Sequence, residues 1–180
     1  PSLSIRYLAP SYNTAEDAAT PYALQVLSEV LGGGPTSRLY ERLVVEDAVA
    51  VSAGSWYSPS AVDTTDFGFY ISPRPDIDLA KAEEALRAEI AELLSEGVSQ
   101  QEVENAIDRL RADAVYAQDN VNTAPRVIGR ALTTGRTVAD VEAWPTRISE
   151  VTPADVEAAA KRVLEPASSV TAVLKPEPTS

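Results

Sequence analysis

The chain has 180 residues, an apolar share of 44%, and 27 acidic against 15 basic residues, which gives a net charge of −12. These values predict one domain, or one compact unit of a longer chain, with a substantial core. The acidic surface is expected to repel nucleic acids and anionic membranes. The alternative is that the acidic residues are simply those of ordinary solvated helix faces. No run of about 18 apolar residues and no signal peptide is present, so no membrane insertion is predicted.

The chain contains no histidine and no cysteine. Their absence excludes disulfides, Ser-His-Asp triads, Cys-His dyads, histidine general bases and the usual zinc ligand sets. A carboxylate site for Mg²⁺ or Ca²⁺ is left open in principle, but the acids fall at helix-surface spacing and no EF-hand spacing occurs. We therefore expect no catalytic residue, no metal and no cofactor in this chain. The chain begins at Pro1 and has no Met, so we expect it to be a processed piece of a longer polypeptide.

The first part of the chain alternates strand and helix patterns. Alternation over residues 3–8 predicts a strand, and the loop after it is expected to contain a helical turn at Thr14–Ala19. Thr20-Pro21 is typical of a helix start, with Thr20 as the cap and Pro21 at the first helical position. Gly32, Gly33 and Gly34 end this helix, and three glycines permit positive φ and close approach of the backbone to a neighbour.

The next segment carries a short helix and two strands. Thr36 or Ser37 is expected to cap a helix that contains Leu39 and Leu43. A strand is predicted at Val49–Trp56, where Val49, Val51 and Ala53 alternate with smaller residues. The next strand has Phe67, Phe69 and Ile71 on one face.

The remainder is predicted to be mainly helical. The apolar pattern indicates a long helix over residues 79–93 that Gly97 closes, and Ser99 with Glu102 forms a capping box for the next. Further helices are expected at Thr123–Thr134, around Val138–Ile148 and from Thr152 to Leu164, before a last strand at 170–174. The order predicts an α+β fold, a mainly antiparallel sheet with helices packed on one face. It is expected as a single domain over 1–175 with a frayed tail at 176–180.

Several motifs, in order and nearly end to end, resemble the pitrilysin/insulinase-type zinc metallopeptidases, which include mitochondrial processing peptidase. These motifs are Leu31–Tyr40 (LGGGPTSRLY), Leu43–Glu46 (LVVE), Trp56-Tyr57, Ser95–Glu102 (SEGVSQQE), Trp144–Ile148 (WPTRI) and Val151–Asp155 (VTPAD). The chain lacks the inverted His-x-x-Glu-His zinc motif of that family. The resemblance therefore identifies it as the C-terminal, catalytically inactive half.

The resemblance implies a function and partners. Family enzymes enclose a chamber between two similar halves, one of which binds zinc while the other helps to hold an extended peptide. It implies that this chain alone cleaves nothing, and that the full-length parent or complex is a zinc metalloendopeptidase. The expected partners are the zinc-bearing half of the same parent chain or a homologous subunit, and a peptide or unfolded protein substrate. The family also suggests a bacterial cell envelope location, the periplasm.

The resemblance also implies candidate substrate-binding residues, namely Gly32, Gly33, Gly34 and Arg42. Many members carry an Arg followed seven residues later by a Tyr, and here Arg42 is followed by Val49, so the pair is broken. This resembles bacterial two-subunit members in which a separate partner supplies the pair.

Alternatives exist for the residues and for the function. The glycines are also typical of a simple helix stop, and Arg42 of an ordinary ion pair with Glu41 or Glu46. The chain could instead be a structural domain of the same fold without a proteolytic role, as in the core proteins of the respiratory cytochrome bc1 complex. An unrelated interaction module is the third alternative.

Overall fold

The computed structural model describes residues 1–175, which contain a four-stranded sheet with the spatial order β2-β3-β1-β4. Every neighbouring pair in the sheet is antiparallel. The strands are β1 (Ser2–Ala9), β2 (Ala50–Tyr57), β3 (Thr65–Pro73) and β4 (Ser169–Leu174). The four predicted strands are therefore confirmed, with β1 and β3 in the interior of the sheet and β2 and β4 at its edges.

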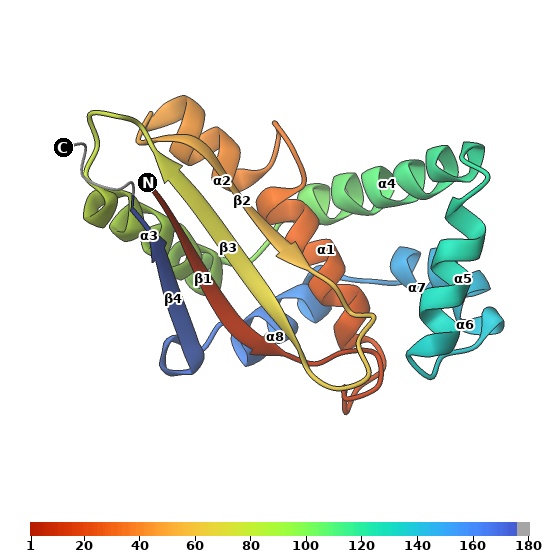
Figure 1. The fold of residues 1–180 in the computed structure, drawn as a ribbon. Helices are drawn as coiled ribbons and strands as arrows, with labels where there is room; N and C mark the ends of the chain where they lie inside the picture. The colour runs from red at the N-terminus through yellow and green to blue at the C-terminus, as the bar shows by residue number, and fades with distance from the viewer. Residues whose placement is uncertain (176–180) are drawn as a thin grey trace.

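Helices α1, α3 and α8 lie together behind the sheet, whereas α4 leads away from it toward α5 (Figure 1). The helical elements are α1 (Thr20–Gly32), α2 (Arg38–Tyr40), the π-helical η1 (Glu41–Glu46), α3 (Leu79–Glu96), α4 (Gln100–Tyr116), η2 (Ala117–Asp119), α5 (Thr123–Thr133), α6 (Val138–Glu142), α7 (Trp144–Ser149), α8 (Pro153–Val163) and η3 (Pro166–Ser168). The predicted α+β class, with helices on one face of a mainly antiparallel sheet, is confirmed.

The core lies between the sheet and the helices behind it. Alternate residues of a strand point to the same face, and in β3 the side chains of Phe67, Phe69 and Ile71 are fully buried. Ile5 of β1, which pairs with Phe69, is buried beside them, and Leu27 of α1 is buried from the helical side. The alternation in the sequence thus predicted the correct inner face of β3.

A bulge in β2 changes which residues share a face. The pairing register shifts between Ala50 and Ser52. Val51 lies at the shift and is 56% exposed, whereas Ala53 is 5% exposed. The expected alternation of Val49, Val51 and Ala53 is wrong at Val51, because an extra residue in one strand interrupts the two-residue period.

The helix starts show where local signals suffice. The predicted capping box of Ser99 and Glu102 opens α4, and Thr152 caps α8 through a bond from the amide of Asp155. The prediction for Thr20 is wrong. It is the first residue of α1 rather than its cap, and no side chain caps that helix. Pro21 is accordingly the second residue of α1 rather than the first, and because it has no N–H to satisfy it reduces the need for a cap at this end.

Two further helical predictions differ from the structure. Residues 14–19 form turns and bends rather than a helical turn. The single helix expected around Val138–Ile148 is divided into α6 and α7 at Ala143. Pro145 explains the division, because it has no N–H to donate to the carbonyl of Val141. The predicted tail at 176–180 lies outside the described residues.

Candidate functional site

Gly32, at the end of α1, lies in close contact with the backbone of β2. A Cβ built on Gly32 would lie 2.1 Å from the amide nitrogen of Ser55. The same contact includes a hydrogen bond from the hydroxyl of Ser55 to the carbonyl of Ser28 at 2.9 Å. The neighbour that needs Gly32 is therefore the chain's own sheet, a contact that neither the substrate-binding prediction nor the helix-stop alternative included. The role of Gly32 in substrate binding stays a prediction.

Gly33 and Gly34 have different surroundings from Gly32. A Cβ on Gly33 would lie 2.1 Å from the carboxyl carbon of Glu29, and that carboxylate pairs with Arg109 of α4 at 2.8 Å. Gly34 has a φ of +135°, a conformation that side-chain-bearing residues rarely adopt, and no atom lies within 4 Å of its built Cβ position. Within the loop between α1 and α2, the space beside Gly34 is therefore open, whereas the Glu29 carboxylate occupies the space beside Gly33.

Ser37 connects the glycine loop to the short helix after it. Its hydroxyl donates to the carbonyl of Gly34 at 2.7 Å. Ser37 is the residue before α2, as predicted, but its side chain forms no capping bond to the helix. The hydrogen bond between Ser37 and Gly34 therefore closes the loop as a tight turn.

Arg42, the predicted substrate-binding cation, is surrounded by carboxylates. Its guanidinium lies 3.0 Å from Glu46, 3.4 Å from Asp47 and 3.4 Å from Glu89 of α3. The hydrogen bond with Glu46 is the main cause of a raised pKa at Arg42. Glu46, one of the two acids named above as an alternative ion-pair partner, does pair with Arg42. A substrate would have to compete with three carboxylates for this guanidinium. The role of Arg42 in substrate binding stays a prediction.

Val49, at the position where many relatives carry a tyrosine, is part of the core and only 7% exposed. Its amide donates to the carbonyl of Leu43 at 3.0 Å, and its carbonyl accepts from the amide of Arg74 at 3.1 Å. The position therefore offers neither a polar group nor a free backbone to a peptide. Val49 therefore does not replace the tyrosine as a second substrate-binding side chain beside Arg42.

An ion pair that the sequence did not predict holds the glycine-loop region against α4. Arg38 donates from Nε and Nη2 to the carboxylate of Glu102, and also to the carbonyl of Gly97 at 2.9 Å. The same carboxylate accepts from Ser99 in the capping box. The pKa of Glu102 is lowered to about 2, chiefly by the hydrogen bond from Arg38. The capping box was readable in the sequence, but its long-range partner was not.

We expect Glu102→Gln to destabilise the domain at neutral pH and progressively less in acid. Because the folded-state pKa lies below the unfolded value, ionised Glu102 stabilises the fold above the unfolded pKa, and this contribution is lost as pH falls from about 4.5 to about 2. The carboxylate is partly exposed, so screening limits the loss at pH 7 to roughly 1–2 kcal/mol. Urea unfolding between pH 7 and pH 3, with Glu104→Gln as the control on the same helix, tests this. A cost for Glu102→Gln that does not change with pH would contradict it.

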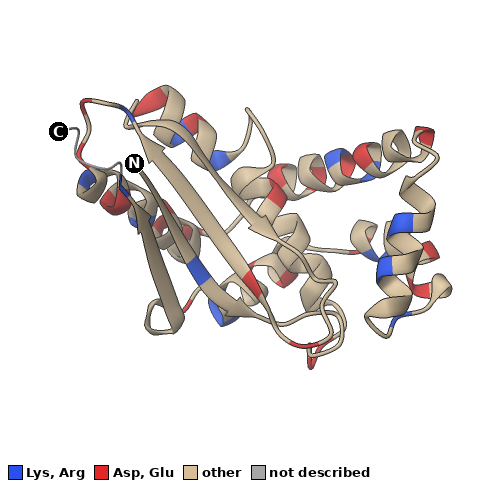
Figure 2. Cartoon of the chain, in the orientation of Figure 1, with Lys and Arg blue, Asp and Glu red and all other residues tan. Residues whose placement is uncertain are grey.

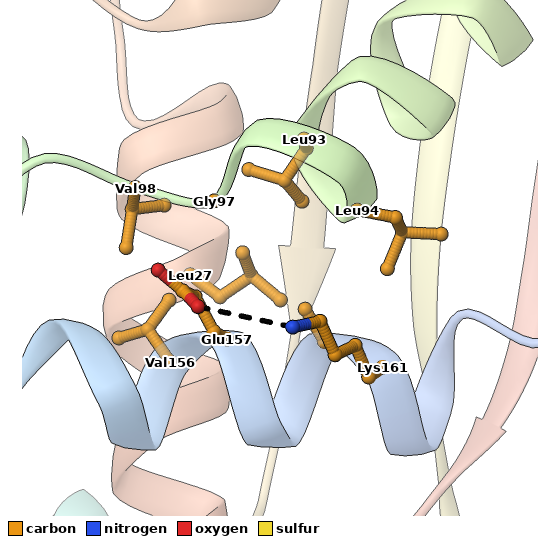
Figure 3. Close-up of a pocket in the computed structure, with 9 residues that line it drawn as sticks. Leu27, Leu93, Leu94, Gly97, Val98, Val156, Glu157 and Lys161 are labelled. Atoms are coloured by element: carbon orange, nitrogen blue, oxygen red, sulfur yellow. Dashed lines mark ion pairs between the residues drawn. The ribbon is translucent and has the colours of Figure 1, made fainter.

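Two hollows on the described part of the chain are smaller than a usual ligand pocket. The depression in Figure 3 has apolar walls from α1, α3 and α8 and the 3.8 Å ion pair of Glu157 with Lys161 at its rim. Its volume is about 0 Å³ for a water-sized sphere. A second hollow near Asp17 and Arg162 has about 150 Å³. Ligand pockets usually measure ~300 Å³ or more.

The described residues do not fit a zinc site. No group of three or more His, Cys, Asp or Glu side chains within residues 1–175 could hold a metal ion. Among the same residues, no helix combines the length and the apolar character needed to cross a bilayer. Acidic and basic side chains are spread over the helices (Figure 2). Fold and site together define an α+β domain with a glycine-rich loop and a set of ion pairs around it.

The comparison with protein families agrees with this class. Residues 1–110 match the family described as the peptidase M16 inactive domain. The chain belongs to this family, which confirms the resemblance to the inactive half of the pitrilysin/insulinase-type peptidases.

Relatives of the chain include proteins that are considerably longer. The chain is 29% identical over 161 residues to an uncharacterized zinc protease of Streptomyces coelicolor, covering 88% of this chain and 35% of that protein. Thus it spans about a third of the length of this relative.

Solved structures show the same fold at low sequence identity. A protease from Helicobacter pylori has a TM-score of 0.86 and 19% identity, over 97% of this chain and 41% of that one. The inactive peptidase domain of a zinc protease of Bordetella parapertussis has a TM-score of 0.83 and 19% identity, over 99% of this chain and 93% of that one. A chain of complex III from Candida albicans has a TM-score of 0.73 and 16% identity, over 94% of this chain and 41% of that one.

Proposed function

We propose that this chain is the non-catalytic half of a zinc metalloendopeptidase, which closes the chamber and helps to hold an extended peptide for hydrolysis by the zinc-bearing half. One observation carries the proposal: a member of the peptidase M16 inactive-domain family contains no histidine and no cysteine. A catalytic zinc site needs such ligands, so they have to come from outside this chain. What this half can contribute is positioning, which is a separate requirement for cleaving an amide.

The test compares the full-length parent with a parent that lacks this segment. We expect the complete parent to cleave a long, unfolded protein substrate and to lose that activity with a chelator. Without this segment, kcat/KM should fall by at least about a hundredfold, since the substrate is no longer held. Zinc content, measured in both proteins, should be unchanged. Full activity of the shortened parent would refute the proposal.

Arg42→Ala in the parent tests the predicted substrate contact. If the guanidinium binds a substrate carbonyl or carboxylate, losing this charge-assisted hydrogen bond should lower kcat/KM about tenfold. Zinc content and melting temperature should stay nearly unchanged, and Arg74→Ala is the control on a nearby exposed arginine. A lower melting temperature with unchanged kinetics would instead assign Arg42 to its ion pairs with Glu46, Asp47 and Glu89.

A structural role without proteolysis is the second candidate, and the fold shared with a complex III chain favours it. The two candidates predict different results for the parent. A structural protein would cleave no substrate even with zinc supplied, and would co-purify in fixed stoichiometry with a larger assembly.

We also propose the bacterial cell envelope as the location of the parent, which cell fractionation tests.

A further inference from the structure

The outer face of the sheet, which is turned away from α1, α3 and α8, has no helix of residues 1–175 in front of it (Figure 1). Successive residues of a strand point to opposite faces, and directly paired residues share a face, so the register identifies the outward side chains. In β3, Gly68 and Tyr70 alternate with the buried Phe67, Phe69 and Ile71 and point outward. One face of the sheet is therefore packed on the core, and the other is open in this chain.

The outer face carries small and apolar side chains and almost no charge. Arg6 and Asp66 are the only charged residues in β1–β4, although 23% of the whole chain is charged. Figure 2 shows the strands mostly tan, whereas the helices carry blue and red. A sheet face that meets water usually alternates in polar side chains, and depletion of charge is typical of an interface. The exposed apolar residues here are Leu8, Tyr70, Val170 and Leu174.

Two aromatic rings lie against the sheet on this face, each over a glycine. A Cβ built on Gly68 would lie 2.0 Å from the ring of Trp56, and one built on Gly54 would lie 2.8 Å from the ring of Tyr70. The two rings are stacked, with their centroids 6.5 Å apart. The rings are thus ordered before any partner arrives, which lowers the entropy lost when a partner binds.

The polar groups of the outer face are already paired with one another. The indole N–H of Trp56 donates to the carboxylate of Asp66 at 2.9 Å. The same carboxylate lies 3.9 Å from the guanidinium of Arg6, which lies 5.4 Å from the centroid of the Trp56 ring. An apolar partner that covers this face therefore leaves these groups with their hydrogen bond and their ion pair.

The backbone of the sheet restricts the form of the partner. Strands β1 and β3 are paired on both sides, so a segment lying over them finds no free N–H or C=O in either strand. Such a segment has to satisfy its own backbone, as a helix does. Beside the rings, Ser72, Ser4 and Ala172 lie on the adjacent strands β3, β1 and β4, and these small side chains permit a close approach. The surface therefore fits the apolar side of an amphipathic helix.

The size of the face fits a contact within one longer polypeptide. Four strands of about eight residues present roughly 500 Å², so that covering them buries an area typical of contacts between domains of one chain. The Streptomyces coelicolor relative has most of its length outside the match, since this chain covers 35% of it. A partner on the same polypeptide also has a high effective concentration.

We propose that the outer face of the sheet is the docking surface for an amphipathic helix from the part of the parent outside this chain, with the apolar side of that helix on Trp56, Tyr70 and Val170. This inference rests on the proposed function in one respect, because both take this chain as one part of a longer parent. It does not require that parent to bind zinc or to cleave a peptide.

Cysteine labelling of the full-length parent tests the docking surface. Ala172→Cys places a thiol on the outer face, and Ala80→Cys places one at the exposed start of α3, in a parent whose other cysteines are replaced by serine. Each rate is divided by the rate of the same variant unfolded in urea. We expect maleimide to label Ala172→Cys at least about tenfold more slowly than Ala80→Cys, because the outer face is covered. Equal normalised rates, with Leu8→Cys as a second probe of the face, would overturn the proposal.

A charge placed on the outer face tests whether the cover is an apolar contact. Val170→Asp, added to Ala172→Cys, should raise the labelling rate to within about threefold of the Ala80→Cys rate, because an unpaired carboxylate in the contact displaces the helix. Val62→Asp, at an exposed position between β2 and β3, is the matched control and should leave the slow rate unchanged. A rate that stays slow with Val170→Asp would contradict the docked helix.

Two further measurements separate this surface from its alternatives. Slow labelling that persists on dilution supports docking within the parent, whereas slow labelling that is lost on dilution overturns it in favour of a second copy. A parent that protects the outer face but cleaves no substrate would keep the docking surface and remove the proposed function. A parent that is active but labels equally at Ala172→Cys and Ala80→Cys would remove the docking surface alone.

Discussion

Replacing Gly32 by alanine is expected to destabilise the domain by roughly 3 kcal/mol, because the new methyl group has no room. The built Cβ lies 2.1 Å from the amide nitrogen of Ser55, and this neighbour is strand backbone rather than the end of a flexible side chain. The end of α1 and strand β2 would have to separate, and the buried contacts between them would be lost. Urea unfolding of the purified domain, followed by circular dichroism, measures the cost.

Gly129→Ala is the matched control for this variant. Gly129 also lies inside a helix, α5, but no atom lies within 4 Å of its built Cβ. Alanine there should stabilise the domain by roughly 0.5–1 kcal/mol, the usual difference between the two residues in a helix. The same substitution should therefore have opposite signs at the two sites. A neutral Gly32→Ala would contradict the packing explanation, and lost activity in a parent of unchanged stability would point to a role toward substrate.

Phe69→Ala is expected to cost roughly 3–5 kcal/mol of unfolding free energy, since it removes a large buried ring and leaves a cavity. Phe69 is fully buried, and its ring lies 5.3 Å from that of Phe67 and 6.0 Å, edge to face, from that of Tyr7. These rings form the centre of the contact between β1, β3 and the helices behind the sheet. Chemical denaturation gives the magnitude directly.

The control for Phe69 is its neighbour Tyr70, which points to the other face of β3 and is 41% exposed. Tyr70→Ala should cost less than about 1 kcal/mol, as is usual for partly exposed positions. Similar losses at the two positions would show that the open face of the sheet contributes as much as the core, in conflict with the observed burial.

Much of the fold could be predicted because its signals are local. Strand alternation placed Phe67, Phe69 and Ile71 on the inner face, and the box of Ser99 and Glu102 marked the start of α4. Both signals depend on residues within a few positions of one another. The failures are local rules that the remainder of the structure overrides, such as Val51 at a bulge that the pairing with β3 creates.

For the candidate site, the sequence predicted which residues to consider but not what they contact. The glycines and Arg42 were identified as a motif, but the motif could not show that Gly32 packs on Ser55 or that Glu89 reaches Arg42 from α3. These contacts join residues that lie more than twenty positions apart. Their existence depends on how helices and strands pack, and a single sequence carries no local record of that.

The amino-acid sequence by itself determined the class of fold, the helix and strand order, and the absence of histidine and cysteine, because these follow from composition and short-range patterns. Only the tertiary structure decided which glycine is needed for packing, which carboxylates hold Arg42, and that Arg38 pairs with Glu102. The physical reason is the same in each case: burial and ion pairing depend on distances between elements, which are set when the sheet and its helices assemble.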